Sequence, residues 1–252
     1  MNNQKLLRGV GQIYRYHKLN KSSCISWRLR FRSICASTEK ELSNWIEEKP
    51  VKKDQPKAIF AACQKFGQGQ MGRNWHSPKG GAWVSAAIER GGAYQNNSEL
   101  YGLAVALALA ERIERIGVDV KIKWPNDLWV NGKKLAGILP RLFFRGGELR
   151  LLRVGVGLNV LNNVPKEGIS LRQIVGDGKI NIHFWSSEVL FAIENSLEFL
   201  ENKKLLCSQV EKRLWAEKYI DKETGYKWDI KGIDLSGRLI LFKEGELKLL
   251  ST

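Results

Sequence analysis

The chain has 252 residues, of which 43% are hydrophobic, and a formal net charge of +15 at pH 7. This size predicts one main globular domain with a small appendage. A membrane-spanning helix is excluded, because no apolar run reaches the ~18 residues that it needs. The four cysteines have no metal-site spacing, which is typical of reduced thiols in a cytosolic protein. They are Cys24, Cys35, Cys63 and Cys207.

The positive charge is concentrated at the N-terminus, where residues 1–38 contain eight Lys or Arg and no Asp or Glu. Three interpretations stay open: a solvated basic extension, a surface for nucleic acid or another acidic partner, and an organellar transit peptide. A secretory signal is not expected, because no apolar segment follows the basic residues. We expect residues 1–26 to be coil. The segment before Ser37 is expected to be too short for a helix-turn-helix domain with a linker.

Residues 27–32 alternate apolar and basic side chains and predict a strand with one solvated face. The sequence Thr38-Glu39-Lys40-Glu41 has the pattern of a capping box and predicts a helix from there to about Glu48. Ser37 and Thr38 therefore lie where a strand ends and a helix begins. Their hydroxyls, with the free N–H groups of the helix start, suit a neutral polar ligand head. Residues 57–64 are predicted to form a buried strand.

A glycine-rich loop follows, and its residues 67–72 match the pattern G-x-G-x-x-G. A dinucleotide site would need a helix to open at once, whereas residues 77–81 contain Ser-Pro and Gly-Gly pairs and residues 82–88 predict another strand. We interpret this segment as a mobile loop between strands whose backbone amides approach an anion. Arg73 adds a charge and Trp75 a stacking face. A flexible hairpin loop without a ligand is the alternative.

Residues 98–116 predict a helix that stops at Gly117. A strand then begins at Lys121, turns at residues 125–127, resumes, and turns again at Asn131-Gly132, a type I′ hairpin signal. This pattern places Lys123 at the end of a strand beside a proline-fixed corner. A cation there can hold a carboxylate or phosphate oxygen. The alternative is a surface lysine on a hairpin.

Residues 135–144 and 149–160 predict two further strands. The second contains Gly155 and Gly157, which are two positions apart, so the same face of the strand lacks a side chain at both positions. This spacing indicates the close approach of a ligand or of another backbone. A bulge or tight packing is the alternative.

The C-terminal part predicts an amphipathic helix over residues 188–206, capped by Ser186 or Ser187, and a shorter helix over residues 210–220 with Trp215 in the core. Short strands follow at residues 226–233, 238–242 and 246–250. These strands form a β meander that is too small to be stable alone, so we expect it to dock on the main domain.

Taken in order and spacing, five motifs resemble those of the bacterial biotin protein ligases, the biotin–[acetyl-CoA-carboxylase] ligases. The motifs are Ser37-Thr38, Gln64 with the 67–73 loop and Trp75, residues 123–127, residues 134–139, and residues 155–159. The resemblance covers roughly residues 33–252. It implies an α/β (α+β) fold in which a mixed β-sheet is flanked by helices, similar to class II aminoacyl-tRNA synthetases. It also implies a basic extension (1–26), a catalytic domain (27–222) and a short C-terminal SH3-like β domain (223–252).

The family's reaction implies ATP, Mg²⁺ and biotin. Biotin is activated to biotinyl-5′-AMP and then transferred to one lysine of the biotin carboxyl carrier protein of acetyl-CoA carboxylase. The resemblance further implies a cytoplasmic enzyme without the N-terminal DNA-binding domain, so that no DNA or membrane partner is expected. Fold relatives pair through sheet edges, and a homodimer stays an open alternative here.

The resemblance also assigns roles to residues. Lys123 is the catalytic cation between the carboxylate and the α-phosphate, and Gly157 leaves room for the bicyclic ring. The implied biotin site is Ser37, Thr38, Gln64, Gly67, Gln68, Gly69, Gln70, Lys123, Gly155 and Gly157. The implied ATP and adenylate site is Arg73, Trp75, Asn126, Lys134 and Asn159. No metal ligands are indicated.

The sequence departs from the family pattern in the loop, which usually reads Gly-Arg-Gly-Arg-x-Gly-Arg. Gln68 and Gln70 replace its first two arginines. Glutamine donates hydrogen bonds but cannot neutralise phosphate, so we expect weaker retention of biotinyl-AMP. A second departure is Glu39, where asparagine is common. A third is the short C-terminal domain.

Three other functions are weighed against this one. A lipoate or octanoate ligase or transferase shares the fold, although the Lys-Trp-Pro-Asn-Asp motif at residues 123–127 favours biotin. A nucleic-acid-binding or repressor protein is suggested by the positive charge. A non-catalytic relative is suggested by the missing loop arginines, but Lys123 argues against it.

Overall fold

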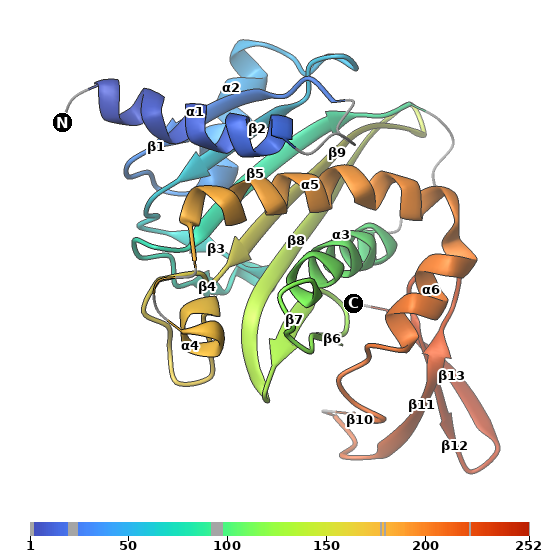
Figure 1. Cartoon of the computed structure of the whole chain (residues 1–252). Coiled ribbons are helices and arrows are strands. Elements are labelled where there is room, and N and C mark those ends of the chain that lie inside the picture. The colour runs from blue at the N-terminus through green and yellow to red at the C-terminus, as the bar shows by residue number, and fades with distance from the viewer. Residues whose placement is uncertain are drawn as a thin grey trace.

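The structure is a computed structural model that describes residues 3–19, 25–91, 98–176, 178, 180–221 and 223–251. A seven-stranded mixed sheet forms its centre, in the order β1-β2-β5-β9-β8-β7-β6 (Figure 1). Its strands are β1 (Arg28–Arg32), β2 (Lys57–Ala61), β5 (Ala82–Glu89), β6 (Lys121–Lys123), β7 (Asp127–Val130), β8 (Lys133–Arg145) and β9 (Glu148–Leu158). β1 and β2 pair in parallel, and the other neighbours pair antiparallel. The predicted mixed sheet flanked by helices is confirmed.

Helices cover both faces of this sheet (Figure 1). The helices α1 (Asn3–Leu19), α3 (Ser98–Glu114) and α5 (Ile182–Glu201) form one layer, and α2 (Thr38–Glu48) packs against β2 and β5 on the opposite face. Side chains alternate along a strand, and β2 shows both environments. Ala58 and Phe60 belong to the large core, whereas Ile59 between them packs with Leu42 of α2.

The most apolar run of the sequence lies in α3, where every residue from Leu100 to Ala110 is buried. A helix that is apolar on all sides needs protein around it, and α3 lies between β8 and α5. The helix ends as predicted, because Gly117 takes a φ of 80° and donates its N–H to the carbonyl of Glu114. In the described part of the chain, no helix is long and apolar enough to cross a membrane.

A second, antiparallel sheet follows near the C-terminus, in the order β10-β11-β12-β13. Its strands are β10 (Lys218–Ile220), β11 (Lys227–Ile233), β12 (Leu239–Lys243) and β13 (Glu246–Leu250). The helix α6 (Lys203–Glu211) packs against β11. The meander docks on the main domain as predicted: Trp228 and Leu241 join the main core, and the Gly237 carbonyl accepts a hydrogen bond of 2.8 Å from Trp124 Nε1.

The predicted coil over residues 1–26 is wrong, because α1 occupies most of it. Gly9, Ile13 and His17 recur at intervals of four and are buried on the side of α1 that packs on α5. The His17 ring lies 4.3 Å from that of Phe191 in α5. The apolar residues Leu6, Val10 and Ile13 recur at helical spacing in the sequence, and this period is the signal for α1 that the prediction of coil overlooked.

The cap predicted for α5 is also wrong. The helix begins at Ile182 and is capped by Asn181, whose Oδ1 accepts hydrogen bonds from two backbone N–H groups of the first turn. Ser186 and Ser187 are buried inside the helix. The Oγ of Ser186 donates to the carbonyl of Ile182 four residues earlier, at 2.8 Å, which is how a serine is accommodated within a helix.

The helix predicted over residues 210–220 is not formed. α6 ends at Glu211, and residues 218–220 form the edge strand β10. Trp215 is 39% exposed instead of lying in the core, and its ring lies 5.3 Å from that of Trp129. The apolar residues of this segment pack on a sheet and a hairpin that are formed by distant parts of the chain. The spacing of apolar residues within the segment does not record such contacts.

Candidate functional site

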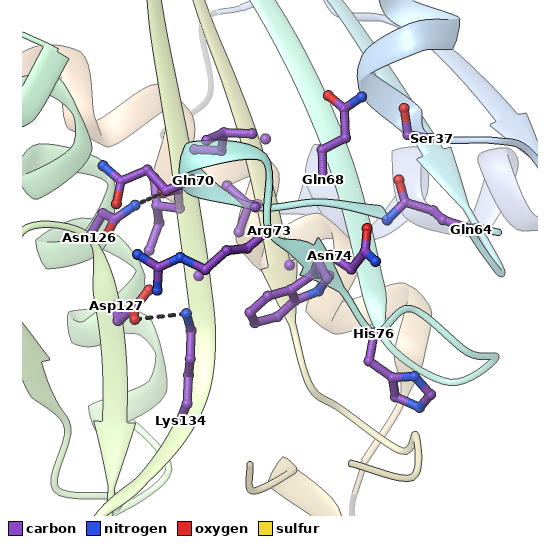
Figure 2. A pocket seen from close by; sticks show the side chains of 18 of the residues that line it. Ser37, Gln64, Gln68, Gln70, Arg73, Asn74, His76, Asn126, Asp127 and Lys134 are labelled. Atoms are coloured by element: carbon purple, nitrogen blue, oxygen red, sulfur yellow. Dashed lines mark hydrogen bonds and ion pairs between the residues drawn. The ribbon is translucent and has the colours of Figure 1, made fainter. Parts of the chain in front are cut away.

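A cavity of about 330 Å³ opens on the α2 side of the sheet, over β8 and β9 (Figure 2). The N-terminus of α2 lies at one end and the hairpin of β7 and β8 at the other. The glycine-rich loop lies over it and is itself folded: β3 (Gly67–Gln68) pairs with β4 (Asn74–Trp75) around a turn, η1 (Gln70–Gly72). The loop before α4 (Leu171–Val175) supplies the remaining wall.

The residues predicted for the two subsites line this one cavity, except Gly67 and Lys123. Gly67 lies at the base of the loop, where a Cβ would overlap Ser77 Oγ, so packing requires glycine there. Other lining residues were not assigned from the sequence. They are Glu39, Asn74, His76, Val84, Ser85, Asp127, Gly137, Ile138, Leu139, Val156, Pro165, Glu167 and Gly168.

One end of the cavity is a neutral polar network. Ser85 Oγ donates to Thr38 Oγ1 at 2.8 Å, and Thr38 Oγ1 donates to Gln64 Oε1 at 3.0 Å. Gln64 Nε2 then donates to Ser77 Oγ at 2.9 Å, and this hydroxyl donates to the Trp75 carbonyl at 3.0 Å. The network ties α2, β5 and the base of the loop together. It presents hydroxyl and amide groups without a net charge.

The capping box predicted at Thr38 is not formed, and the N-cap lies one residue earlier. Ser37 is the N-cap: its φ is −153°, and its Oγ accepts the hydrogen bond from the Lys40 N–H at 3.1 Å. The Thr38 hydroxyl is therefore free to join the polar network. The Thr38 N–H, one of the unpaired donors of the first turn, donates to Gln64 Oε1 at 2.7 Å.

The other end of the cavity is cationic. Lys134 Nζ lies 2.7 Å from Asp127 Oδ2 and 4.9 Å from the centroid of the Trp75 ring. The Arg73 side chain extends toward the same hairpin (Figure 2). No described carboxylate forms an ion pair with Arg73. Arg73 and Lys134 thus bring two positive charges to this end, and Asp127 pairs with Lys134 alone, an arrangement suited to phosphate or carboxylate oxygens.

The Trp75 indole covers the sheet between these two ends. It lies over Gly137 and Gly157, which are paired residues of β8 and β9. A Cβ at Gly137 would come within 3.1 Å of the indole, and one at Gly157 would overlap its Nε1. Gly157 therefore makes room for Trp75. It also lines the cavity, and its role in leaving room for a ligand ring stays a prediction. Gly155 faces the cavity beside Glu39.

Asn126 and Asn159 line the cavity, but their side chains also brace its walls. Asn126 Nδ2 donates to the carbonyl of Ile138, and the Ile138 N–H donates to the Asn126 carbonyl at 2.9 Å. Asn159 Oδ1 accepts from Asn162 Nδ2 at 3.0 Å. These bonds hold the β7–β8 hairpin and the end of β9 in place.

The structure does not bring Lys123 into the cavity. This side chain is exposed, and its Nζ lies 4.0 Å from the ring centroid of Trp129. Lys134 occupies the position that was expected for Lys123. Two turns separate the lysines, one at residues 124–126 and one at Asn131-Gly132. After the second turn the chain runs back along β8, which places Lys134 near the glycine-rich loop. Both lysines lie beside a turn at the end of a strand, so the sequence alone does not show which of them enters the cavity.

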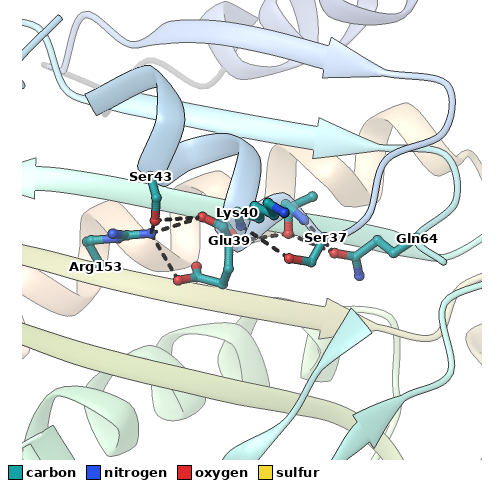
Figure 3. Close-up of polar contacts among 8 residues, drawn as sticks. Ser37, Glu39, Lys40, Ser43, Gln64 and Arg153 are labelled. Atoms are coloured by element: carbon teal, nitrogen blue, oxygen red, sulfur yellow. Dashed lines mark hydrogen bonds and ion pairs between the residues drawn. The ribbon is translucent and has the colours of Figure 1, made fainter. Parts of the chain in front are cut away.

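A buried ion pair lies behind the polar end (Figure 3). Arg153 Nη2 is 3.1 Å from Glu39 Oε2 and also donates to the Glu39 carbonyl at 3.1 Å and to Ser43 Oγ at 2.9 Å. Both side chains are 7% exposed. Burial lowers the pKa of the Arg153 guanidinium, and the Glu39 carboxylate opposes that shift.

No group of three or more His, Cys, Asp or Glu side chains within the described ranges could hold a metal ion. Asp127 pairs with Lys134 at the cationic end, and Glu167 also lines the cavity. One or two carboxylates suit Mg²⁺ that is held mainly by phosphate and water oxygens. Cys35 and Cys207 are buried thiols and Cys63 is half-buried; Cys24 lies outside the described residues.

Comparison with known proteins places the cavity in a family context. The sequence profile of the Biotin/lipoate A/B protein ligase family matches residues 33–159. The bifunctional ligase/repressor BirA of Bacillus subtilis is 33% identical over 171 residues, which are 62% of this chain and 50% of the relative. The biotin–[acetyl-CoA-carboxylase] ligase of Paracoccus denitrificans is 33% identical over 113 residues, 44% of this chain and 46% of the relative. The chain thus spans about half the length of the curated relatives it matches.

The fold is also that of solved structures. The biotin protein ligase of Aquifex aeolicus, in complex with biotin and ATP, superposes with a TM-score of 0.73 at 24% identity. The superposition covers 88% of this chain and 95% of that one. The likeness therefore extends over most of this chain.

Proposed function

The chain belongs to the biotin/lipoate A/B protein ligase family, and we propose that it is an ATP-dependent biotin protein ligase. In the first step it joins biotin to the α-phosphate of ATP, giving biotinyl-5′-AMP and pyrophosphate. In the second step it transfers biotin to a lysine of a carrier protein and releases AMP. The carrier that we propose is the biotin carboxyl carrier protein of acetyl-CoA carboxylase, as named for the Paracoccus relative.

The observation that carries this proposal is the polarity of the cavity. A neutral network around Thr38 and Gln64 lies at one end, and the cations Arg73 and Lys134 lie at the other, with Trp75 between them. A ligand with an uncharged polar head and an anionic tail fits this order. Biotin has a urea ring at one end and a carboxylate at the other.

The first step brings two anions together, because a carboxylate oxygen attacks the α-phosphorus while pyrophosphate leaves. Fixed cations must offset the repulsion. We assign this role to Lys134, since its Nζ lies in the cavity, and we withdraw it from Lys123. Arg73 is suited to a phosphate oxygen. Mg²⁺ bound to ATP would neutralise further phosphate charge, and Asp127 is the residue that would ligate it.

The second step needs a neutral amine, because the carrier lysine attacks the acyl carbonyl of biotinyl-AMP through its lone pair and AMP departs with the bonding electrons. A lysine of ordinary pKa, about 10.4, must lose a proton first. The mixed anhydride must be kept from water in the meantime. The folded 67–76 loop, with Trp75 against the sheet, supports this shielding role.

The second candidate is a lipoate or octanoate ligase, which the same family profile includes. The test is transfer of labelled biotin, in the presence of ATP and Mg²⁺, to a carrier domain with its acceptor lysine intact or replaced. Lipoate and octanoate are assayed in parallel. Transfer of biotin that depends on the acceptor lysine supports the proposal. Transfer of lipoate or octanoate alone, to a competent carrier, would replace it with the second candidate.

A further inference from the structure

Most polar groups at the neutral end of the cavity satisfy one another. Gln64 uses its Oε1 for two hydrogen bonds from Thr38 and its Nε2 for one to Ser77. One acceptor is left over: Glu39 Oε1 is buried and has no hydrogen-bond partner among the described residues. Glu39 is only 6% exposed and lines the cavity. A buried carboxylate oxygen without a donor is costly, so this atom indicates a missing donor.

The rest of the Glu39 side chain is held firmly. Its other oxygen, Oε2, pairs with Arg153 at 3.1 Å, and the same guanidinium nitrogen holds the Glu39 carbonyl and Ser43 Oγ (Figure 3). Arg153 lies on the face of β9 that also carries Gly155, because the two are separated by two positions. A Cβ at Gly155 would lie 3.5 Å from Glu39 Oε1. Arg153 therefore fixes the position of the carboxylate, whose unpaired oxygen lies over a glycine.

A second unpaired polar atom lies nearby on the same face. Trp75 Nε1 is a buried donor without a partner among the described residues, and it lies over Gly157. Residues two apart on a strand are about 7 Å apart. A urea group presents an N–H and a C=O on adjacent atoms, so it can fill such a gap with one hydrogen bond of about 2.9 Å at each end. A dithiolane ring or a saturated acyl chain can do neither.

We propose that Glu39 determines specificity in this site: its Oε1 accepts a hydrogen bond from one ureido N–H of biotin, and Arg153 is its positioning residue. This inference rests on the proposed function and deepens it. Glu39 stands where asparagine is common in the family that the sequence resembles. A carboxylate accepts but cannot donate, so Glu39 selects for a ligand N–H and against lipoate.

The first experiment changes the ligand and leaves the protein intact. Dissociation constants of the wild-type chain are measured by calorimetry for biotin and for two analogues, each methylated on one ureido nitrogen. A hydrogen bond to a charged group corresponds to about 10- to 100-fold in affinity. We expect a loss of this size for one of the two analogues. If both analogues bound with affinities within about threefold of that of biotin, the inference would be overturned, and this result needs no protein variant.

The second experiment removes the acceptor together with its counter-charge. The double variant Glu39→Met with Arg153→Met replaces the buried pair by apolar side chains of similar volume, which proteins often tolerate. We expect it to bind biotin about 10- to 100-fold more weakly than the wild type does. The methylated analogue that binds weakly to the wild type should bind this double variant about as well as biotin does. Its affinity for ATP should stay unchanged.

A matched control tests whether loss of any buried pair has the same effect. Arg112 in α3 and Glu188 in α5 form another ion pair, with both side chains 5% exposed, outside the cavity lining. The double variant Arg112→Met with Glu188→Met should bind biotin like the wild type. Equal biotin affinity in all three proteins would show that Glu39 is merely structural and overturn the inference. If the wild-type chain bound ATP but no biotin, the proposed function itself would fail.

Discussion

Lys134 and Lys123 provide the sharpest test of how the cavity works. Lys123 precedes the turn between β6 and β7, and Lys134 follows the turn between β7 and β8. Lys134 Nζ lies 2.7 Å from Asp127 inside the cavity, whereas Lys123 lies over Trp129 outside it. We predict that Lys134→Met abolishes most biotin activation. Lys123→Met, the matched control, should leave activity within about threefold of the wild type, as for other exposed side chains.

The expected magnitude follows from the geometry. Two unit charges about 4 Å apart interact with about 4 kcal/mol at an effective dielectric constant of about 20. Removal of one donor that stabilises a developing anion costs about 2.7–4 kcal/mol, or 10²- to 10³-fold in rate. Lys134→Met also leaves Asp127 without its close cation beside the phosphates. We therefore expect a fall of about 10²- to 10³-fold.

The assay is biotin-dependent exchange of labelled pyrophosphate into ATP, which reports the first step without a carrier protein. Circular dichroism and thermal melting confirm that each variant is folded. Exchange by Lys134→Met within about threefold of the wild type would refute the placement of this cation at the reacting groups. A loss of 10²-fold or more in Lys123→Met would restore the role predicted from the sequence.

Three further predictions follow from the loop, the glycines and the thiols. Gln70→Arg adds a charge that can hold phosphate, so biotinyl-AMP should dissociate about tenfold more slowly in a chase experiment; an unchanged rate would contradict the reasoning. Gly157→Ala forces Trp75 off the sheet and should lower the free energy of unfolding by about 1–3 kcal/mol in urea titrations, whereas adding Trp75→Ala should restore it. Burial raises the pKa of the Cys35 and Cys207 thiols to about 11, so both should react slowly with iodoacetamide near neutral pH in peptide mass mapping, and rapid labelling of either would count against their burial.

The sequence by itself determined the features that depend on neighbouring residues. The hairpin at Asn131-Gly132 has positive φ at both residues, as its composition requires. The strands β5 and β9 were predicted nearly to their ends. The order of five short motifs was enough to identify the family, because each motif is a local arrangement of turn and strand residues.

The tertiary structure alone decided which of these residues meet. The helix α1 packs on α5, and one of the two lysines enters the cavity because of the path of β8. The glycine spacing in β9 predicted close approach of some group, but only packing shows that Trp75 lies over Gly157. The unpaired oxygen of Glu39 depends on Arg153, which is 114 residues away in the sequence. Contacts between distant segments set these features, and no local pattern in a single sequence records them.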